Sequence, residues 1–299
     1  MPDFIDILSD HKVLVSDGAW GTAMMHGGLK AGECPEKWNK DHPDRLRVIA
    51  KAFVEAGADI IGTNSFGGTR IKLDHYGLSD QVIDLNARAA EISRKAAGDS
   101  VLVMGTMGPT GKMLITGDVS EAQMFDAFSE QGMGLEKGGA DLLIIETMTD
   151  LQEAGIAVSA CLENTSLPLI CSMSFETAVE DQYATIMGIS PAQFVGSQIN
   201  SGIKVLGSNC GKGTGEMLGV AEQLRKETPD FPLMIQANAG IPAYVDGEMR
   251  FQDEPEDWKT YIQELFKLNI NIIGGCCGTT PDFIRNIRKW VDEFLSSPV

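Results

Sequence analysis

Two adjacent cysteines near the C-terminal end of the sequence are the residues best suited to chemistry. They stand in the stretch Asn271–Pro281, where an apolar run ends in Gly274 and Gly275 and is followed at once by Cys276 and Cys277. Disulfide geometry does not fit neighbouring residues well, so we do not expect these two thiols to bond to each other. Thiolates at the end of a strand are typical metal ligands. The alternative is a tight strand-to-helix turn with two small buried thiols.

Other reactive side chains also come directly after short apolar runs. They are Asp17, Thr63, Asn64, Glu146, Cys210 and Asn238. The remaining cysteines follow a different pattern. We expect Cys161 in a helix and Cys171 inside a strand, so both are interpreted as core residues, and Cys34 stands in a long loop where it could be exposed. Cys210 is therefore the candidate for a third metal ligand beside Cys276 and Cys277.

Three thiolates form a soft ligand set that indicates zinc and leaves a fourth position open. Hydrolytic zinc more often has histidine and carboxylate ligands, and none of the 4 histidines follows an apolar run. A zinc ion with three thiolates carries net negative charge and is a poor Lewis acid for water. It suits a substrate thiol, which is mostly protonated at neutral pH when free. The sequence therefore favours thiol activation over a zinc hydrolase.

The two carboxylates at strand ends extend this prediction to the rest of the substrate. Asp17 and Glu146 could bind an ammonium group, and the backbone amides of the loop from Gly18 to Thr22 could bind a carboxylate group. Together these groups describe a thiol-bearing amino acid. The alternative is that each carboxylate caps the helix or loop that follows it. The predicted substrate contacts are Asp17, Gly18, Ala19, Thr22, Asn64 and Glu146.

Eight alternating strand and helix patterns are expected to position these residues. The predicted strands cover 12–17, 59–63, 101–106, 141–146, 167–173, 205–210, 233–236 and 271–274. Strands that are apolar throughout are typical of a parallel sheet covered on both faces. The pattern predicts a (β/α)8 TIM barrel, in which active sites lie at the C-terminal ends of the strands. A doubly wound open sheet is the alternative, but the loop after the first strand lacks the GxGxxG pattern.

The predicted connections follow helix and turn signals. We expect helices that open at Pro43, near residue 80, at Ser120, at Ser190, at Glu254 and at Pro281. Thr149 is the expected cap of the helix after the fourth strand. A glycine-rich loop is expected at 18–22, and a polar loop after the fifth strand.

Composition limits the kinds of partner that the protein can have. The chain has 299 residues, 43% of them hydrophobic and 22% charged, and a net charge of −18. This charge repels phosphate backbones and anionic membranes, so we expect no nucleic-acid or membrane binding. No apolar run is long enough to span a bilayer, and the N-terminus has no signal-peptide pattern. We expect one cytoplasmic domain over residues 1–299.

Motifs along nearly the whole chain resemble the homocysteine S-methyltransferase family. The resemblance is strongest to the homocysteine-binding module of cobalamin-dependent methionine synthase and weaker to betaine–homocysteine methyltransferase. The matching segments are Asp17–Thr22, Gly57–Phe66, Gly108–Thr110, Gly139–Thr147, Asn209–Cys210, Asn238–Gly240 and Gly274–Pro281.

This resemblance implies a (β/α)8 barrel whose zinc ligands fall on Cys210, Cys276 and Cys277. It also implies homocysteine-binding acids at Asp17 and Glu146, and an oxygen ligand from Asn238 when substrate is absent. The implied activity is methyl transfer to homocysteine, activated as a zinc thiolate, which forms methionine.

Two departures from the family concern the substrate and the donor. Trp20 stands where the family often has Met or Phe, and the loop 174–188 differs from the methionine-synthase version. The resemblance to the cobalamin-dependent enzyme implies a methyl-corrinoid donor, loaded from methyltetrahydrofolate or another methyl source. We expect no folate- or cobalamin-binding domain in these 299 residues, so the corrinoid is expected on a separate protein. The alternatives are S-methylmethionine or betaine as donor, or a thiol- and zinc-binding module without turnover.

Overall fold

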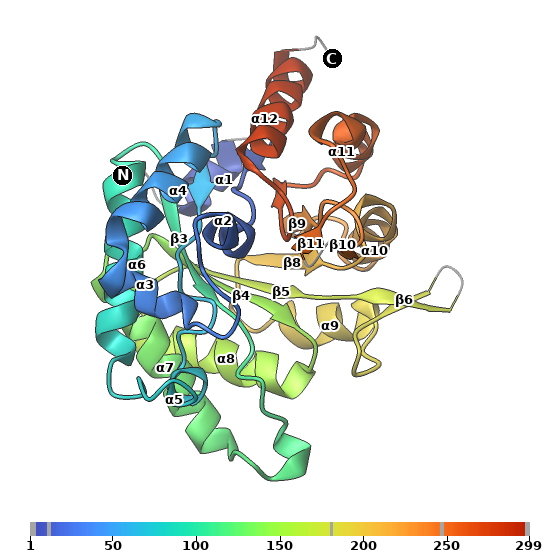
Figure 1. Ribbon diagram of the computed structural model, residues 1–299. Coiled ribbons are helices and arrows are strands. Elements are labelled where there is room, and N and C mark those ends of the chain that lie inside the picture. Colours follow the sequence, from blue (N-terminus) through green and yellow to red (C-terminus); the bar gives the residue numbers. More distant parts are fainter. Residues whose placement is uncertain (1–3, 11–12, 180–181, 246–247, 297–299) are drawn as a thin grey trace.

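Eight parallel strands form a closed ring at the centre of the molecule, surrounded by helices (Figure 1). The computed structural model describes residues 4–10, 13–179, 182–245 and 248–296. The strands follow one another around the ring in the order β1-β12-β9-β8-β5-β4-β3-β2. A parallel bridge between Ser16 and Ile60 joins the first of these strands to the last. The fold is therefore the predicted (β/α)8 TIM barrel, and the closure excludes an open sheet.

All eight predicted strands are present. They are β1 (Leu14–Val15), β2 (Ile60–Ile61), β3 (Leu102–Met107), β4 (Leu142–Met148), β5 (Leu169–Met173), β8 (Val205–Cys210), β9 (Leu233–Ala237) and β12 (Ile272–Gly275). Residue 12, which the first predicted strand included, lies outside the described residues. Each barrel strand is almost completely buried, which is why the sequence reads as continuous apolar runs.

The larger helices cover the outside of the ring. They are α4 (Pro43–Glu55), α6 (Val82–Ala97), α7 (Glu121–Lys137), α8 (Leu151–Asn164), α9 (Pro191–Gln198), α10 (Thr214–Glu227), α11 (Lys259–Lys267) and α12 (Pro281–Ser296). The shorter helices are α1 (Phe4–Asp10), α2 (Trp20–His26), α3 (Trp38–Asp41), α5 (Arg70–Asp74) and the 3-10 turns η1 (Pro35–Lys37), η2 (Leu114–Thr116) and η3 (Pro255–Trp258). Ser120 and Ser190 open α7 and α9 with capping boxes, as their sequence signals predict.

The interior of the barrel is apolar at one end and polar at the other. Apolar side chains from the strands pack together inside the barrel towards the N-terminal ends of the strands, where Phe4 and Leu8 of α1 join them. Two residues further along each strand, the next position that points into the barrel carries a small or polar residue. These residues are Ser16, Gly62, Thr106, Glu146, Ser172, Gly207, Gln236 and Gly274. This change leaves room for a polar site at the C-terminal ends of the strands.

Several connections differ from the expected loops. Helix α2 begins at Trp20, inside the expected glycine-rich loop, because Trp20 and Met24 pack against buried side chains. Asp150 rather than Thr149 caps α8, since its carboxylate accepts bonds from the backbone amides of Gln152 and Glu153.

The expected polar loop after the fifth strand forms a hairpin of β6 (Glu176–Val179) and β7 (Gln182–Ala184), which projects from the barrel in Figure 1. A second hairpin, β10 (Ala243–Val245) and β11 (Glu248–Arg250), follows β9.

The cysteines outside the strand ends are all buried. Cys161 and Cys171 lie in the core as predicted. Cys34 is only 6% exposed, so the expectation of an exposed thiol was wrong. Its sulfur donates to Glu36 and packs in a small apolar cluster with Leu73 and Leu85, which the loop pattern did not indicate. Within the described residues, no helix is both long and apolar enough to cross a membrane.

Candidate metal centre and substrate site

Three thiols meet at one end of the barrel. Cys210 is the last residue of β8, and Cys276 and Cys277 follow β12 directly. Strands β8 and β12 are the two neighbours of β9, so their ends lie on the same side of the ring. The three Sγ atoms all lie within 4.8 Å of one another. Cys210 has a φ of 73°, a left-handed conformation that is uncommon for residues other than glycine and turns the chain sharply at the site.

The three thiols differ in how readily they lose a proton. Hydrogen bonds from the thiols of Cys276 and Cys277 lower the pKa of Cys210. The same interactions raise the pKa of Cys276, and the bond to Cys210 raises the pKa of Cys277 to about 12. These hydrogen bonds therefore favour loss of the proton from Cys210 before the other two thiols. A divalent metal ion would displace those protons, which is the usual coupling between metal binding and deprotonation.

Asn238 offers an oxygen donor beside this cluster. Its amide nitrogen donates to the Gly211 carbonyl at 2.6 Å and to the Cys210 sulfur at 3.5 Å. Its Oδ1 atom is buried and has no hydrogen-bond partner. Buried side-chain oxygens are rarely left unpaired, and a metal ion would satisfy this one. Three soft sulfur atoms and one oxygen fit the ligand set of zinc.

Two carboxylates share the same end of the barrel. Asp17 follows β1, and its Oδ2 atom accepts hydrogen bonds from the Gly62 amide and the Trp20 indole, both at 2.7 Å. Burial raises the pKa of Asp17 to about 6. Glu146 lies in β4, where burial, then the charge of Asp17, then that of Cys210 raise its pKa to about 8. The site thus places two acidic groups together, and a bound cation such as an ammonium group would stabilise their ionised forms.

The glycine-rich segment after β1 packs against the loop that carries the two adjacent cysteines. The amide of Ala19 donates to the Thr279 carbonyl at 3.1 Å, and the Thr22 hydroxyl accepts from the amide of Gly278 at 3.1 Å. Gly18 allows this close approach, because a Cβ atom there would lie 2.7 Å from the Thr279 hydroxyl. These residues therefore join the carboxylate of Asp17 to the thiol cluster.

Asn64 follows β2 and bonds residues of η1 and α3. Its amide nitrogen donates to the carbonyl oxygen of Pro35 at 2.7 Å and to Asn39 Oδ1 at 3.0 Å. The bonds described for this side chain therefore hold neighbouring loops together, and its role as a substrate contact stays a prediction.

Sequence reasoning assigned no role to three residues that contact the site. Trp20 donates to Asp17, and Asn209 contacts both Cys276 and Thr147. Asn209 could have been suspected from its place beside Cys210. The conformation of Thr147, with a φ of 58°, leaves no local signal in the sequence.

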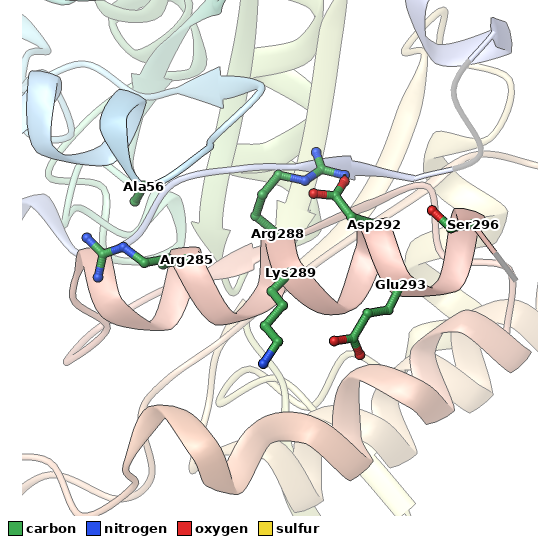
Figure 2. Close-up of a pocket in the computed structure, with 7 residues that line it drawn as sticks. All are labelled: Ala56, Arg285, Arg288, Lys289, Asp292, Glu293 and Ser296. Atoms are coloured by element: carbon green, nitrogen blue, oxygen red, sulfur yellow. The ribbon is translucent and has the colours of Figure 1, made fainter.

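The surface hollow along α12 is unrelated to this site (Figure 2). The Arg288 guanidinium forms ion pairs with Asp59 at 2.9 Å and with Asp292 at 2.7 Å. Figure 2 shows Arg285 and Lys289 pointing in other directions, so the basic groups do not converge on a common ligand.

Comparisons with known proteins agree with this geometry. The model of the family described as "Homocysteine S-methyltransferase" matches residues 14–291. Methionine synthases from Mycobacterium leprae and Mycobacterium tuberculosis are each 28% identical to the chain over 97% of its length. The chain spans only 25% of each of these relatives.

Among solved structures, the metallated form of the homocysteine methyltransferase MmuM from Escherichia coli superposes with a TM-score of 0.79. The match covers 95% of this chain and 98% of MmuM at 22% sequence identity, which supports the shared fold. The family match covers the barrel and includes all three clustered cysteines and both carboxylates. The chain belongs to the homocysteine S-methyltransferase family.

Proposed function

We propose that this protein transfers a methyl group to the sulfur of homocysteine and so forms methionine. The observation that carries the proposal is the meeting of three thiols, within 4.8 Å of one another, with two carboxylates whose pKa values are raised. The first set suits a metal ion that binds sulfur, and the second suits an ammonium group. Homocysteine carries both a thiol and an ammonium group. Family membership and the methionine synthase relatives support the same substrate.

The residues have distinct tasks in this proposal. Cys210, Cys276 and Cys277 would hold zinc, and Asn238 Oδ1 would be the fourth ligand when substrate is absent. Bound zinc would favour the deprotonated form of the substrate sulfur at neutral pH. Asp17 and Glu146 bind the ammonium group, whose positive charge lowers the pKa of both carboxyls and keeps them ionised.

The reaction is a displacement at the methyl carbon. The homocysteine sulfur attacks the methyl group, a new C–S bond forms, and the bond between the methyl group and the donor breaks. The electron pair of that bond stays with the donor. The thiol proton leaves the site before the transfer, so the displacement itself requires no general base among the residues described above.

A methyl-corrinoid carried by a separate protein is the proposed donor. The methionine synthase relatives suggest a corrinoid, and the surface around the site suits a large partner. Exposed apolar side chains in the segments that follow the barrel strands are Met25, Phe66, Tyr76, Met113, Ile115, Ile186, Met187 and Ile241. Met113, Ile115, Ile186 and Met187 line one hollow between the segments after β3 and β5. A protein that delivers a methyl group into the barrel would cover this surface.

A donor assay tests the proposal. The zinc-loaded protein is incubated with homocysteine and with methylcobalamin, S-methylmethionine or betaine, and methionine is measured by mass spectrometry. We expect methionine from methylcobalamin. Product from betaine or S-methylmethionine alone would reject the corrinoid donor but keep the methyltransferase. The variant Cys277→Ala is the control for uncatalysed transfer.

The hairpin of β6 and β7 motivates a second candidate, a thiol- and zinc-binding module without turnover. This segment stands in the region that differs from methionine synthase and projects from the barrel. The module would bind homocysteine but form no methionine with any donor. A single productive donor would remove this candidate.

A further inference from the structure

One buried amide connects the thiol cluster with the strand that carries Glu146. The Asn209 amide nitrogen donates to the Thr147 hydroxyl at 2.7 Å and contacts the Cys276 sulfur at 3.8 Å. Its Oδ1 atom accepts from the amide of Thr147 at 2.9 Å and from the hydroxyl of Ser172 at 2.7 Å. The side chain is completely buried and crosses β5, because β5 lies between β4 and β8.

The backbone of β4 is irregular where Asn209 contacts it. Ile145 pairs with Cys171 and Met148 with Met173, so three steps along β4 match two steps along β5. This extra residue is a β-bulge, and such bulges change the direction of side chains next to active sites. Thr147 within the bulge has a φ of 58°, which is costly for a β-branched residue unless its surroundings hold it.

Asn209 supplies the hydrogen bonds that hold Thr147 in this strained conformation. It pairs with both the amide and the hydroxyl of Thr147, the residue next to Glu146. The neighbouring strands leave space for the network, since a Cβ atom on Gly207 would lie 3.2 Å from the Cβ of Ser172. The direction of the Glu146 side chain therefore depends on a bulge that Asn209 holds, and the same amide contacts a thiol of the metal cluster.

We propose that Asn209 is a positioning residue that sets the separation between the metal-binding thiols and the Glu146 carboxylate. It fixes the sulfur end and the ammonium end of the substrate site through one rigid group. The site then selects thiols that carry an amino group at the correct distance. This inference rests on the proposed zinc and homocysteine site.

The test compares two thiols that differ only in the amino group. Binding of homocysteine and of 4-mercaptobutanoate to the zinc-loaded protein is measured by calorimetry for the unmodified chain and for Asn209→Ala. We expect the unmodified protein to prefer homocysteine, and the preference to fall about tenfold in Asn209→Ala. Zinc affinity, measured by competition with a chromophoric chelator, should also fall by roughly 10–100-fold, as is typical when a residue that supports a metal ligand is removed.

Asn86→Ala is the matched control. Asn86 is also a buried asparagine, and within the described part of the chain its amide nitrogen donates to the backbone carbonyls of Gly68 and Val82, away from the site. We expect this variant to lose stability but to keep the preference for homocysteine. An equal loss of preference in both variants would reduce Asn209 to a structural residue and overturn the inference.

Thr147→Val keeps the shape of the side chain and removes its hydroxyl. It should lower the preference for homocysteine while zinc affinity stays within about threefold of the unmodified protein, because Asn209 still contacts Cys276. If Asn209→Ala does not fold, Thr147→Val tests the inference in its place. An unchanged preference of Thr147→Val for homocysteine over 4-mercaptobutanoate would then reject it. Absence of homocysteine binding in the unmodified protein would instead reject the proposed function.

Discussion

The three thiols of the cluster differ in how readily they lose a proton, but a metal ion needs all three sulfur atoms. Cys210 has a lowered pKa because two thiols donate to it, whereas the hydrogen bonds to Cys210, and then burial, raise the pKa of the other two. Removing any one sulfur leaves two thiols, which is too few for a stable zinc site.

The first prediction concerns zinc content. Cys276→Ala should purify with less than about a tenth of the zinc of the unmodified protein, because a ligand is lost outright. Cys161→Ala is the control, since its sulfur lies in the core near Met107 rather than at the site. Metal analysis by mass spectrometry gives the result. Full zinc content in Cys276→Ala would exclude this cluster as the zinc site.

The second prediction concerns pH. The pKa of Glu146 is raised from 4.5 to about 8, so the folded protein binds its proton more tightly than the unfolded chain. Above pH 4.5 the unfolded chain loses this proton first, so the contribution of Glu146 to stability falls as pH rises towards about 8. Chemical denaturation between pH 5 and 8 should show a smaller loss of stability in Glu146→Gln than in the unmodified protein. Parallel pH profiles for the two proteins would contradict the assignment.

The same raised pKa predicts proton release on ligand binding. An ammonium group beside Glu146 favours the carboxylate, so binding of methionine at pH 7 should release up to about one proton. Methionine has no thiol, and its thioether contributes no proton of its own. Calorimetry in two buffers with different ionisation enthalpies measures the number, and Glu146→Gln should abolish most of it. Unchanged release in that variant would place the proton elsewhere.

At the scale of elements, sequence patterns predicted the barrel strands because buried parallel strands carry an unbroken apolar signal. Cys210, Cys276 and Cys277 could be grouped because each stands at such a strand end. The bulge at Thr147 and the reach of Asn209 across β5 could not be predicted, because they depend on the register between strands. Helix α2 was missed because it also depends on tertiary contacts: the packing of Trp20 outweighs the glycines that predicted a loop at 18–22.

Helix α1 closes the apolar end of the barrel and gives a prediction about stability. Phe4 is 3% exposed and packs with the strand side chains inside the ring. Phe4→Ala should destabilise the fold by about 3 kcal/mol, measured by chemical denaturation. Zinc content should be unchanged, since the thiols lie at the opposite end of the strands. Loss of zinc in a folded Phe4→Ala protein would contradict this separation of stability from function.

Phe294→Ala is the comparison for that measurement. Phe294 is 40% exposed and stacks on Phe266 at the surface of α12. Its removal should cost about 1 kcal/mol, because less apolar surface leaves contact with the core. A loss equal to that of Phe4→Ala would show that burial inside the barrel brings no additional stability.

At the scale of the whole molecule, a net charge of −18 contrasts with the apolar side chains around the site. Ile115 and Ile186 are 84% and 83% exposed and line the same hollow between the segments after β3 and β5. In the proposed function, a donor protein would cover this apolar surface. Docking and chemistry can therefore be separated by experiment.

The final prediction tests that separation with the double variant Ile115→Ser and Ile186→Ser. The apparent KM for a corrinoid-carrying protein donor should rise about fivefold or more, because apolar contacts at the proposed interface are lost. Transfer from free methylcobalamin and the affinity for homocysteine should stay unchanged, because neither requires the docking surface. Val48→Ser on α4 is the control, since Val48 is 68% exposed on the outer wall. An equal effect of Val48→Ser, or a parallel loss with free methylcobalamin, would show that this hollow does not receive the donor protein.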